Sequence, residues 1–188
     1  MKKTPVYEHP DFVVQTDDLR REKENKRLWL SLTIDNDSLD SVVVILKNPS
    51  RATAKESDKT VSNVTNYIHK NRMNYQHLKN VGKIFILNLI PFYETDSSKL
   101  VFLKEKVIDK ENHETINEFC SKHKNVIIAW GNHPKGLYNE YEYLKKLVRK
   151  ILKTNNNNIF YVDKFSKNDN PKHGQVWGYK NRLIEFKL

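Results

Sequence analysis

The sequence predicts a three-layer α/β/α domain with a central four-stranded, mainly parallel sheet. The chain has 188 residues, of which 38% are hydrophobic, enough for one sizeable core and short for two. Short runs of β-branched residues recur along it, and segments with the helical spacing of apolar residues separate these runs. Strands that alternate with helices favour a sheet covered on both of its faces.

The predicted strands are apolar on both sides, as central strands of a covered sheet are. They are residues 41–46 (SVVVIL), 83–89 (KIFILNL), 125–130 (NVIIAW) and 159–162 (IFYV). Residues 28–34 form an alternating strand before them, and the almost wholly charged residues 17–27 indicate a solvated turn or an exposed helix. We therefore expect one domain over residues 1–188, with an N-terminal extension at 1–27 and a core at roughly 28–179.

The predicted helices lie between these strands, and each has one apolar face. Their apolar positions are Val61, Val64 and Ile68; Ile116, Phe119 and Cys120; and Leu137, Tyr141, Leu144, Val148 and Leu152. Asp58 precedes the first helix as a candidate N-cap, and Asn112 precedes the second. The polar residues 154–158 are expected to form a loop.

The composition narrows the partners and the compartment. A formal net charge of +10 favours a polyanionic partner, such as nucleic acid or an acidic membrane face, although it also serves solubility. The single cysteine, Cys120, excludes an intrachain disulfide and a cysteine-based zinc cluster, and it fits a reducing cytoplasm. The N-terminus lacks the apolar run of a signal peptide, and no stretch has membrane length. We expect a cytoplasmic protein.

Ligands of open parallel sheets bind beyond the carboxyl ends of the strands, so the residues after each predicted strand are candidates for a site. The segment 48–50 (NPS) makes a turn after the first run, and Asn88 interrupts an apolar run as either a satisfied amide or a ligand contact. His133 follows a Trp-Gly turn, and His173 lies in a polar loop. Each has an ordinary structural explanation when taken alone.

Together and in this order, these segments resemble the motifs of the uracil-DNA glycosylase superfamily. KNPS (residues 47–50) looks like its Gly-x-Asn-Pro-Gly loop, ILNL (residues 86–89) like its Leu-Leu-Asn strand end, and AWGNH (residues 129–133) like its Leu-Trp-Gly-Ser-His turn. The resemblance covers roughly residues 28–179. It implies the same fold.

The chain is still more similar to a family long labelled as a domain of unknown function, often carried on mobile cassette elements and linked to glycosylase-like proteins. The shared marks are NPS-x-A (residues 48–52), Asp-x-Thr (residues 58–60) and a terminal Pro-x-His (residues 171–173). A strand-end Asn and a Trp-Gly complete the pattern.

The resemblance implies a DNA repair hydrolase that excises uracil without a metal or another cofactor. His173 would donate to the pyrimidine oxygen as charge develops, and Asn48 would hold the attacking water, which makes these two the expected catalytic residues. Asn88, Pro49 and Ser50 would bind the base.

The loops around this site are expected to bind DNA. Arg51, Lys135 and Lys172 would contact phosphates, unless they are ordinary solvated surface. Val176 or Trp177 would fill the space that a flipped nucleotide leaves, or Trp177 would stack on single-stranded bases. The expected partners are single-stranded or uracil-containing DNA and a glycosylase-inhibitor protein.

Departures from the superfamily pattern leave the activity open. Asn48 stands where the fastest branch has Asp, so no carboxylate is expected to activate the water, and slow turnover follows. Ser50 stands where an aromatic residue excludes thymine. The chain is therefore either an active glycosylase or a pseudo-enzyme that binds single-stranded DNA or acts as a decoy for inhibitor proteins. A metal-dependent nuclease is not favoured, because only isolated acidic residues such as Glu94 and Asp96 follow the strands.

Overall fold

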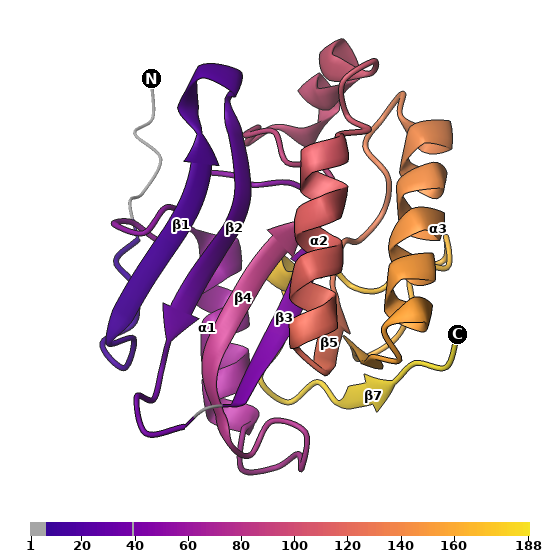
Figure 1. Cartoon of the computed structure of the whole chain (residues 1–188). Coiled ribbons are helices and arrows are strands. Elements are labelled where there is room, and N and C mark those ends of the chain that lie inside the picture. Colours follow the sequence, from indigo (N-terminus) through magenta and orange to yellow (C-terminus); the bar gives the residue numbers. More distant parts are fainter. Residues whose placement is uncertain (1–6, 39) are drawn as a thin grey trace.

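The computed structural model describes residues 7–38 and 40–188 (Figure 1). Over these residues the chain forms one mixed sheet of seven strands in the order β1-β2-β4-β3-β5-β6-β7. The strands are β1 (Gln15–Arg21), β2 (Lys26–Thr33), β3 (Asp40–Leu46), β4 (Val81–Asn88), β5 (Asn125–Ile128), β6 (Asn158–Val162) and β7 (Leu183–Glu185). The predicted α/β class is confirmed.

The prediction of a four-stranded, mainly parallel sheet is wrong in its extent. The four predicted strands correspond to β3, β4, β5 and β6, which pair in parallel, but β1, β2 and β7 add antiparallel pairings at the two edges. β1 comes from the charged segment for which the sequence indicates a turn or an exposed helix. Its backbone pairs with β2 while its charged side chains line an edge of the sheet. A charged edge strand lacks the apolar pattern by which strands are predicted, so the sequence does not indicate it.

Helices cover both faces of the sheet (Figure 1). α1 (Lys59–Asn71) packs on one face, and α2 (Lys110–Lys122) and α3 (Tyr138–Thr154) pack on the other. Short 3-10 stretches occur at η1 (Glu22–Glu24), η2 (Ser97–Leu103) and η3 (Gly174–Val176). Asp58 caps α1 as expected, because its Oδ1 accepts the Val61 N–H at 2.8 Å. The cap of α2 is Asp109, and Asn112 lies inside that helix.

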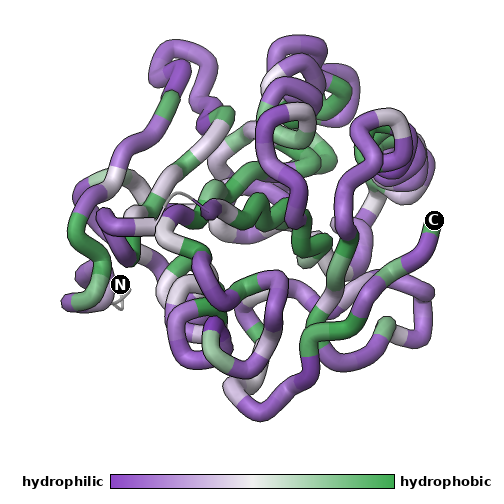
Figure 2. The backbone as a smooth tube through the Cα atoms, turned by 60° about the horizontal axis from the view of Figure 1, so that its bottom comes forward, coloured by the Kyte–Doolittle hydropathy of each residue, from purple (hydrophilic) through white to green (hydrophobic). Residues whose placement is uncertain are grey.

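Alternate residues of the central strands enter two separate cores. Val42, Val44 and Leu46 of β3 face α1, whereas Val43 and Ile45 face α2 and α3. Figure 2 shows the hydrophobic segments gathered inside, with hydrophilic segments around them. No described helix is both long enough and apolar enough to cross a lipid bilayer.

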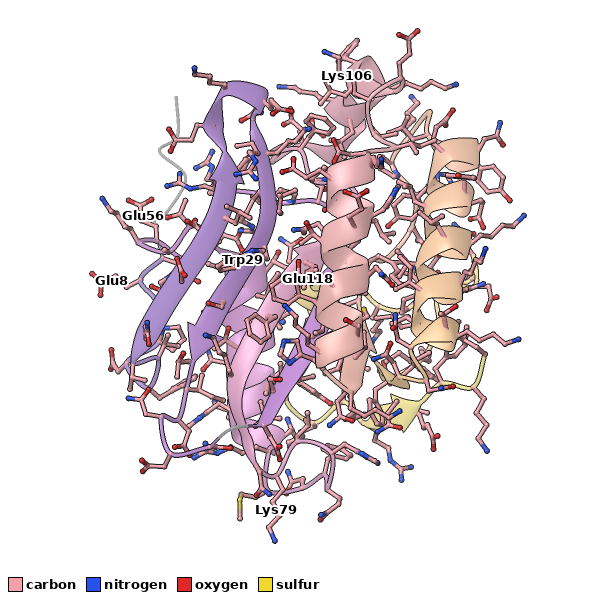
Figure 3. All side chains as sticks on the ribbon, in the orientation of Figure 1. Glu8, Trp29, Glu56, Lys79, Lys106 and Glu118 are labelled. Atoms are coloured by element: carbon pink, nitrogen blue, oxygen red, sulfur yellow. The ribbon has the colours of Figure 1, made fainter. Side chains whose placement is uncertain are left out.

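Charged side chains project outward from the helices and the edge strands (Figure 3). In this view Lys106 and Lys79 mark opposite ends of the molecule along the strand direction. The carboxyl ends of β3 and β4 point toward the end at which Lys106 lies. That end carries the loops in which the sequence places the candidate site.

Candidate functional site

A cavity of about 290 Å³ opens at the carboxyl end of β3, on the face that α1 covers. Its wall comes from the loop after β3, the loop after β4, the start of α1 and the segment around η3. The neutral polar residues of the wall are Asn48, Ser50, Thr60, Thr95, Ser97 and Gln175. This inner cavity, as we call it here, lies where open α/β sheets bind their ligands.

Both expected catalytic residues line the inner cavity. Asn48 comes from the loop after β3 and His173 from the segment before η3, so the fold joins residues that are far apart in the sequence. Ser50 also lines the cavity, whereas Pro49 is buried beside it and does not reach the wall. The fold thus brings three of the five expected catalytic and base-binding residues to one cavity.

The side chain of Asn48 ties two loops together. Its Nδ2 donates to the main-chain carbonyl of Pro49 at 2.9 Å and to that of Glu94 at 2.7 Å. These bonds fix the loop after β3 against the loop after β4 and leave the side-chain Oδ1 as the remaining polar atom. Oδ1 is an acceptor only, which suits a water molecule that must keep a lone pair free for attack.

His173 is held as a neutral ring with a defined tautomer. Its Nδ1 accepts the main-chain N–H of Gln175 at 3.3 Å, so the single ring proton resides on Nε2. Burial, and then the nearby Lys47 ammonium, lower the pKa of His173 to about 4, against a smaller opposite effect of Asp58. At neutral pH the ring therefore offers an N–H donor without a positive charge.

Close packing sets the position of the His173 segment. Gly174 lies against α1, where a Cβ would stand 2.5 Å from Val64 Cγ2, and Asn63 Nδ2 donates to the Gly174 carbonyl at 2.7 Å. Gly131, at a φ of +66°, lies where a Cβ would stand 2.9 Å from the Cβ of His173. The Trp-Gly turn after β5 therefore contributes by letting His173 approach.

Asn88 lies directly behind the cavity wall. It pairs in register with Leu46, which lines the cavity, so the two side chains share the α1 face of the sheet. Asn88 is fully buried, and among the described residues neither of its amide side-chain atoms has a hydrogen-bond partner. An unpaired buried polar group costs about 1–3 kcal/mol, so this amide marks a position where a ligand or a water molecule belongs.

Two cations, one fully buried and one half-buried, line the inner cavity, and neither is among the expected site residues. Arg27 is 1% exposed, and burial lowers the pKa of its guanidinium. Lys47 is half-buried, and burial lowers the pKa of its ammonium. The sequence analysis places Arg27 in the charged N-terminal extension. Arg27 stands directly before the apolar strand that begins at Leu28, and the strand pattern does not mark it as inward-facing.

Two carboxylates also line the inner cavity. Asp58 receives the N–H of Val61 at 2.8 Å and that of Ala52 at 3.3 Å, while Glu94 Oε1 receives the Asp96 N–H at 2.9 Å. Position 48 carries an amide, as the sequence shows, but two acidic side chains from other segments lie in the same cavity wall. Asp58 belongs to the Asp-x-Thr mark, and its double role as helix cap and cavity wall explains why the pattern needs an acid there.

A second cavity of about 310 Å³, which we call the outer cavity, adjoins the first. The two have five lining residues in common: Ser50, Asp58, Thr60, Thr95 and Gln175. Arg51 and Lys59 line only the outer cavity, and both are exposed. Arg51 thus lies beside the site, as expected of a phosphate contact.

The fold does not bring the other expected DNA-binding cations to either cavity. Lys135 is exposed outside both, and Lys172 forms an ion pair with Asp163. His133 also lies elsewhere, with its ring centroid 5.2 Å from that of Tyr138. The third strand end therefore supplies Gly131, not a histidine, to the site.

Trp177 is a core residue. It is 4% exposed, it meets the Tyr67 ring edge-on at 5.1 Å, and its Nε1 donates to the Lys172 carbonyl at 3.2 Å. The expectation that Trp177 stacks on bases or fills the stack conflicts with this burial, because stacking requires an exposed ring face. Val176, at the end of η3, is 60% exposed, so of these two residues only Val176 presents an apolar side chain at the surface.

Among the described residues, no group of three or more His, Cys, Asp or Glu side chains is arranged to hold a metal ion. A model of one protein family matches residues 26–174 and carries the description "Protein of unknown function (DUF1643)". No curated protein and no solved structure matches the chain. The matched segment includes the wall of the inner cavity up to His173, and Gln175 lies just beyond it. The match spans most of the chain, which therefore belongs to the DUF1643 family.

Proposed function

We propose that this protein binds DNA and hydrolyses the N-glycosidic bond of uracil in a single strand, as a metal-free glycosylase. One observation carries the proposal: Asn48 and His173 line one cavity, and His173 is a neutral donor through Nε2. Excision of a base needs such a donor, because negative charge gathers on the departing pyrimidine. The net charge of +10 suits a polyanionic strand.

In this mechanism the target nucleotide flips into the inner cavity. The bond between C1′ and the pyrimidine nitrogen breaks, and its electron pair leaves with the base, whose oxygen receives the hydrogen bond of His173 Nε2–H. Asn48 Oδ1 holds the water that attacks C1′ of the cationic sugar. The water proton passes to the Asp58 carboxylate and then to solvent, and solvent protonates the released base.

Asn88 and Val176 complete the proposed binding of the nucleotide. The unpaired amide of Asn88 offers both a donor and an acceptor to the Watson-Crick edge of a base once the wall at Leu46 admits it. Val176, next to the cavity residue Gln175, would enter the gap that the flipped base leaves in the stack.

The test is excision from a labelled single-stranded oligonucleotide with one uracil, read as strand cleavage after alkali, with a chelator present. We expect His173→Ala to lower the rate by about 10²–10³-fold, the usual effect of removing one donor to a developing oxyanion. His133→Ala is the matched control, because His133 lies outside both cavities, and its rate should equal that of the wild type.

A second candidate function is a DNA-binding pseudo-glycosylase or a decoy for inhibitor proteins. The burial of Trp177 favours it, because only the small side chain of Val176 is then left to fill the gap that a flipped base leaves in the stack. Salt-sensitive binding of the same oligonucleotide with no excision by the wild type would establish this function and refute the hydrolase.

A further inference from the structure

We propose that the inner cavity contains a phosphate-binding subsite, formed by Arg27, Lys47 and the N-terminus of α1. The subsite itself requires no bond cleavage and goes beyond the proposed function. The identity of its ligand as the phosphate of a nucleotide rests on that function.

The first observation is a buried guanidinium without an anionic partner. Arg27 is 1% exposed and lines the cavity, its Nη1 donates to the Ala52 carbonyl at 2.6 Å, and its Nε has no partner among the described residues. No described carboxylate forms an ion pair with it. Tyr93, Asp58 and Asp18 lie near enough to counter part of the effect of burial on the pKa of Arg27, and its guanidinium lies 5.9 Å from the centroid of the Tyr93 ring. Because buried charges in proteins are usually paired and none of these groups forms an ion pair with Arg27, an anionic ligand would supply the missing pair.

The second observation is that α1 begins at the same cavity. Thr60 and Val61, in its first turn, line the wall, and this helix of 13 residues directs its positive end there. Asp58 accepts the Val61 N–H, which leaves the N–H groups of Lys59 and Thr60 as the unused donors of the first turn. Main-chain donors at a helix start, together with an Arg, are a recurrent arrangement for phosphate.

The third observation concerns the electric field inside the cavity. The effect of Lys47 on the pKa of His173 exceeds the opposite effect of Asp58, so the field at the His173 ring is positive although Asp58 and Glu94 line the same wall. Both carboxylates receive main-chain N–H groups, whereas Lys47 has no described carboxylate within ion-pair distance. The unpaired charge of the cavity is therefore cationic.

The chemistry of these donors selects the ligand. Guanidinium and ammonium groups donate and never accept, and Thr60 and Ser50 add hydroxyl donors nearby, so the group they suit is an oxyanion with several acceptor oxygens. The rest of the inner cavity provides room for the base and its sugar beside such a group, and the adjoining outer cavity provides room for a neighbouring part of the ligand. The ligand we infer is therefore a phosphorylated nucleoside, whether it is a free mononucleotide or part of a strand.

The experiment titrates inorganic phosphate into the full chain, against chloride at equal ionic strength, by calorimetry and by NMR of the His173 ring. We expect bound phosphate to raise the pKa of His173 from about 4 toward its ordinary value of 6.5, because an anion reverses the positive field. Arg27→Gln and Lys47→Gln should each weaken binding about tenfold to a hundredfold, as the loss of a charge-assisted hydrogen bond does.

The controls separate the subsite from general charge and from folding. Lys150→Gln removes the same charge from the exposed surface of α3, on the other side of the sheet, and should bind phosphate as the wild type does. Arg27 also supports the Ala52 carbonyl, so near-UV circular dichroism checks the fold of its variant. Lys47→Gln loses no side-chain hydrogen bond found among the described residues. If Arg27→Gln unfolds, phosphate binding by Lys47→Gln therefore tests the subsite.

Two ligands then distinguish a free nucleotide from a strand: deoxyuridine monophosphate, and an oligonucleotide that contains only phosphodiesters. The ligand whose affinity falls more in Lys47→Gln is the one for which the subsite is built. A wild-type His173 pKa that phosphate does not move, or binding that survives both substitutions, would overturn the inference. Phosphate binding without excision of uracil would leave the subsite standing and remove the proposed function. Excision of uracil without phosphate binding would refute the subsite and support the proposed function.

Discussion

Two fully buried asparagines meet at the carboxyl end of β4 and differ in how their amides are used. Asn112, on α2, donates through Nδ2 to the main-chain carbonyls of Asn88 and Leu89, at 3.0 and 3.2 Å. Asn88, on the α1 face, has no described partner for either side-chain atom. The same residue type thus donates two hydrogen bonds on one face, where only its Oδ1 lacks a described partner, and makes no side-chain hydrogen bond on the other.

This contrast extends to the two faces of the sheet. Under α2 and α3 the core is mainly apolar, and the hydroxyl of Tyr141 donates to the Trp130 carbonyl at 2.8 Å, although Trp130 Nε1 has no described partner. The α1 face contains the inner cavity, with the buried Arg27 and the half-buried Lys47. We infer that the first face supplies stability and that the second gives up some of it for binding.

The largest effect on stability is expected from truncating a core side chain on the face of the sheet that α2 and α3 cover. Leu144→Ala, on α3, should lower the free energy of unfolding by about 2–5 kcal/mol without changing phosphate binding by the folded protein. Val64→Ala, on α1, should cost less, but it removes the methyl group against which Gly174 packs and should alter the NMR signals of His173. Urea unfolding and NMR measure both. Equal changes in the NMR signals of His173 in the two variants would show that the two faces of the sheet do not differ in this way.

A smaller effect is expected from acid. The pKa of His173 in the folded chain, about 4, lies below its ordinary value of 6.5, so the stability linked to this ring is complete above about pH 6.5 and is lost as the pH falls toward 4. At about 1.36 kcal/mol for each unit of pKa, the loss reaches at most about 3 kcal/mol.

His173→Gln should therefore lose less stability than the wild type between pH 7 and pH 4.5, as measured by urea unfolding. His69, His113 and His123, whose pKa values burial also lowers, are present in both proteins, so the difference isolates His173. Equal losses in the two proteins would contradict the neutral, low-pKa ring.

The two asparagines provide the next comparison. Asn112→Ala should cost about 1–3 kcal/mol, because two buried carbonyls lose their donor. Asn88→Ala should cost clearly less, because it removes a polar group that makes no bond. Thermal or urea unfolding gives both values, and an equal or larger cost at Asn88 would show that its amide is already satisfied.

The smallest effect is expected at Lys47. Lys47→Met keeps an unbranched side chain of similar length and removes a half-buried, unpaired charge. It should therefore raise the free energy of unfolding by up to about 1 kcal/mol while weakening phosphate binding. A loss of stability together with unchanged binding would assign Lys47 a structural role instead.

The elements that could be predicted from the sequence are those with a strong local pattern. The β-branched runs predicted β3, β4, β5 and β6. The spacing of Val61, Val64 and Ile68 after Asp58 predicted α1. β1 was missed because its residues are charged and its only sign of being a strand is its pairing with β2.

The candidate site could be predicted where a residue follows a strand, and not where a distant contact decides. Asn48 falls into the first group, whereas His173 lies well beyond the end of β6 and was expected from the Pro-x-His mark of the resemblance. Trp177 falls into the second, since it lies in a polar loop by sequence and is buried by Tyr67, which comes from α1. Arg27 faces the cavity from β2, at the point where the pairing with β1 shifts register, and a sequence pattern carries no sign of such a shift.

We propose that the inner cavity is where this protein binds nucleic acid. The most direct measurement is NMR of the histidine rings and asparagine side-chain amides while a short single-stranded oligonucleotide with one uracil is added. Our account predicts that the signals of His173, Asn48 and Asn88 shift with a common affinity while those of His133 stay in place. Shifts confined to His133 and the surface around it would contradict the account.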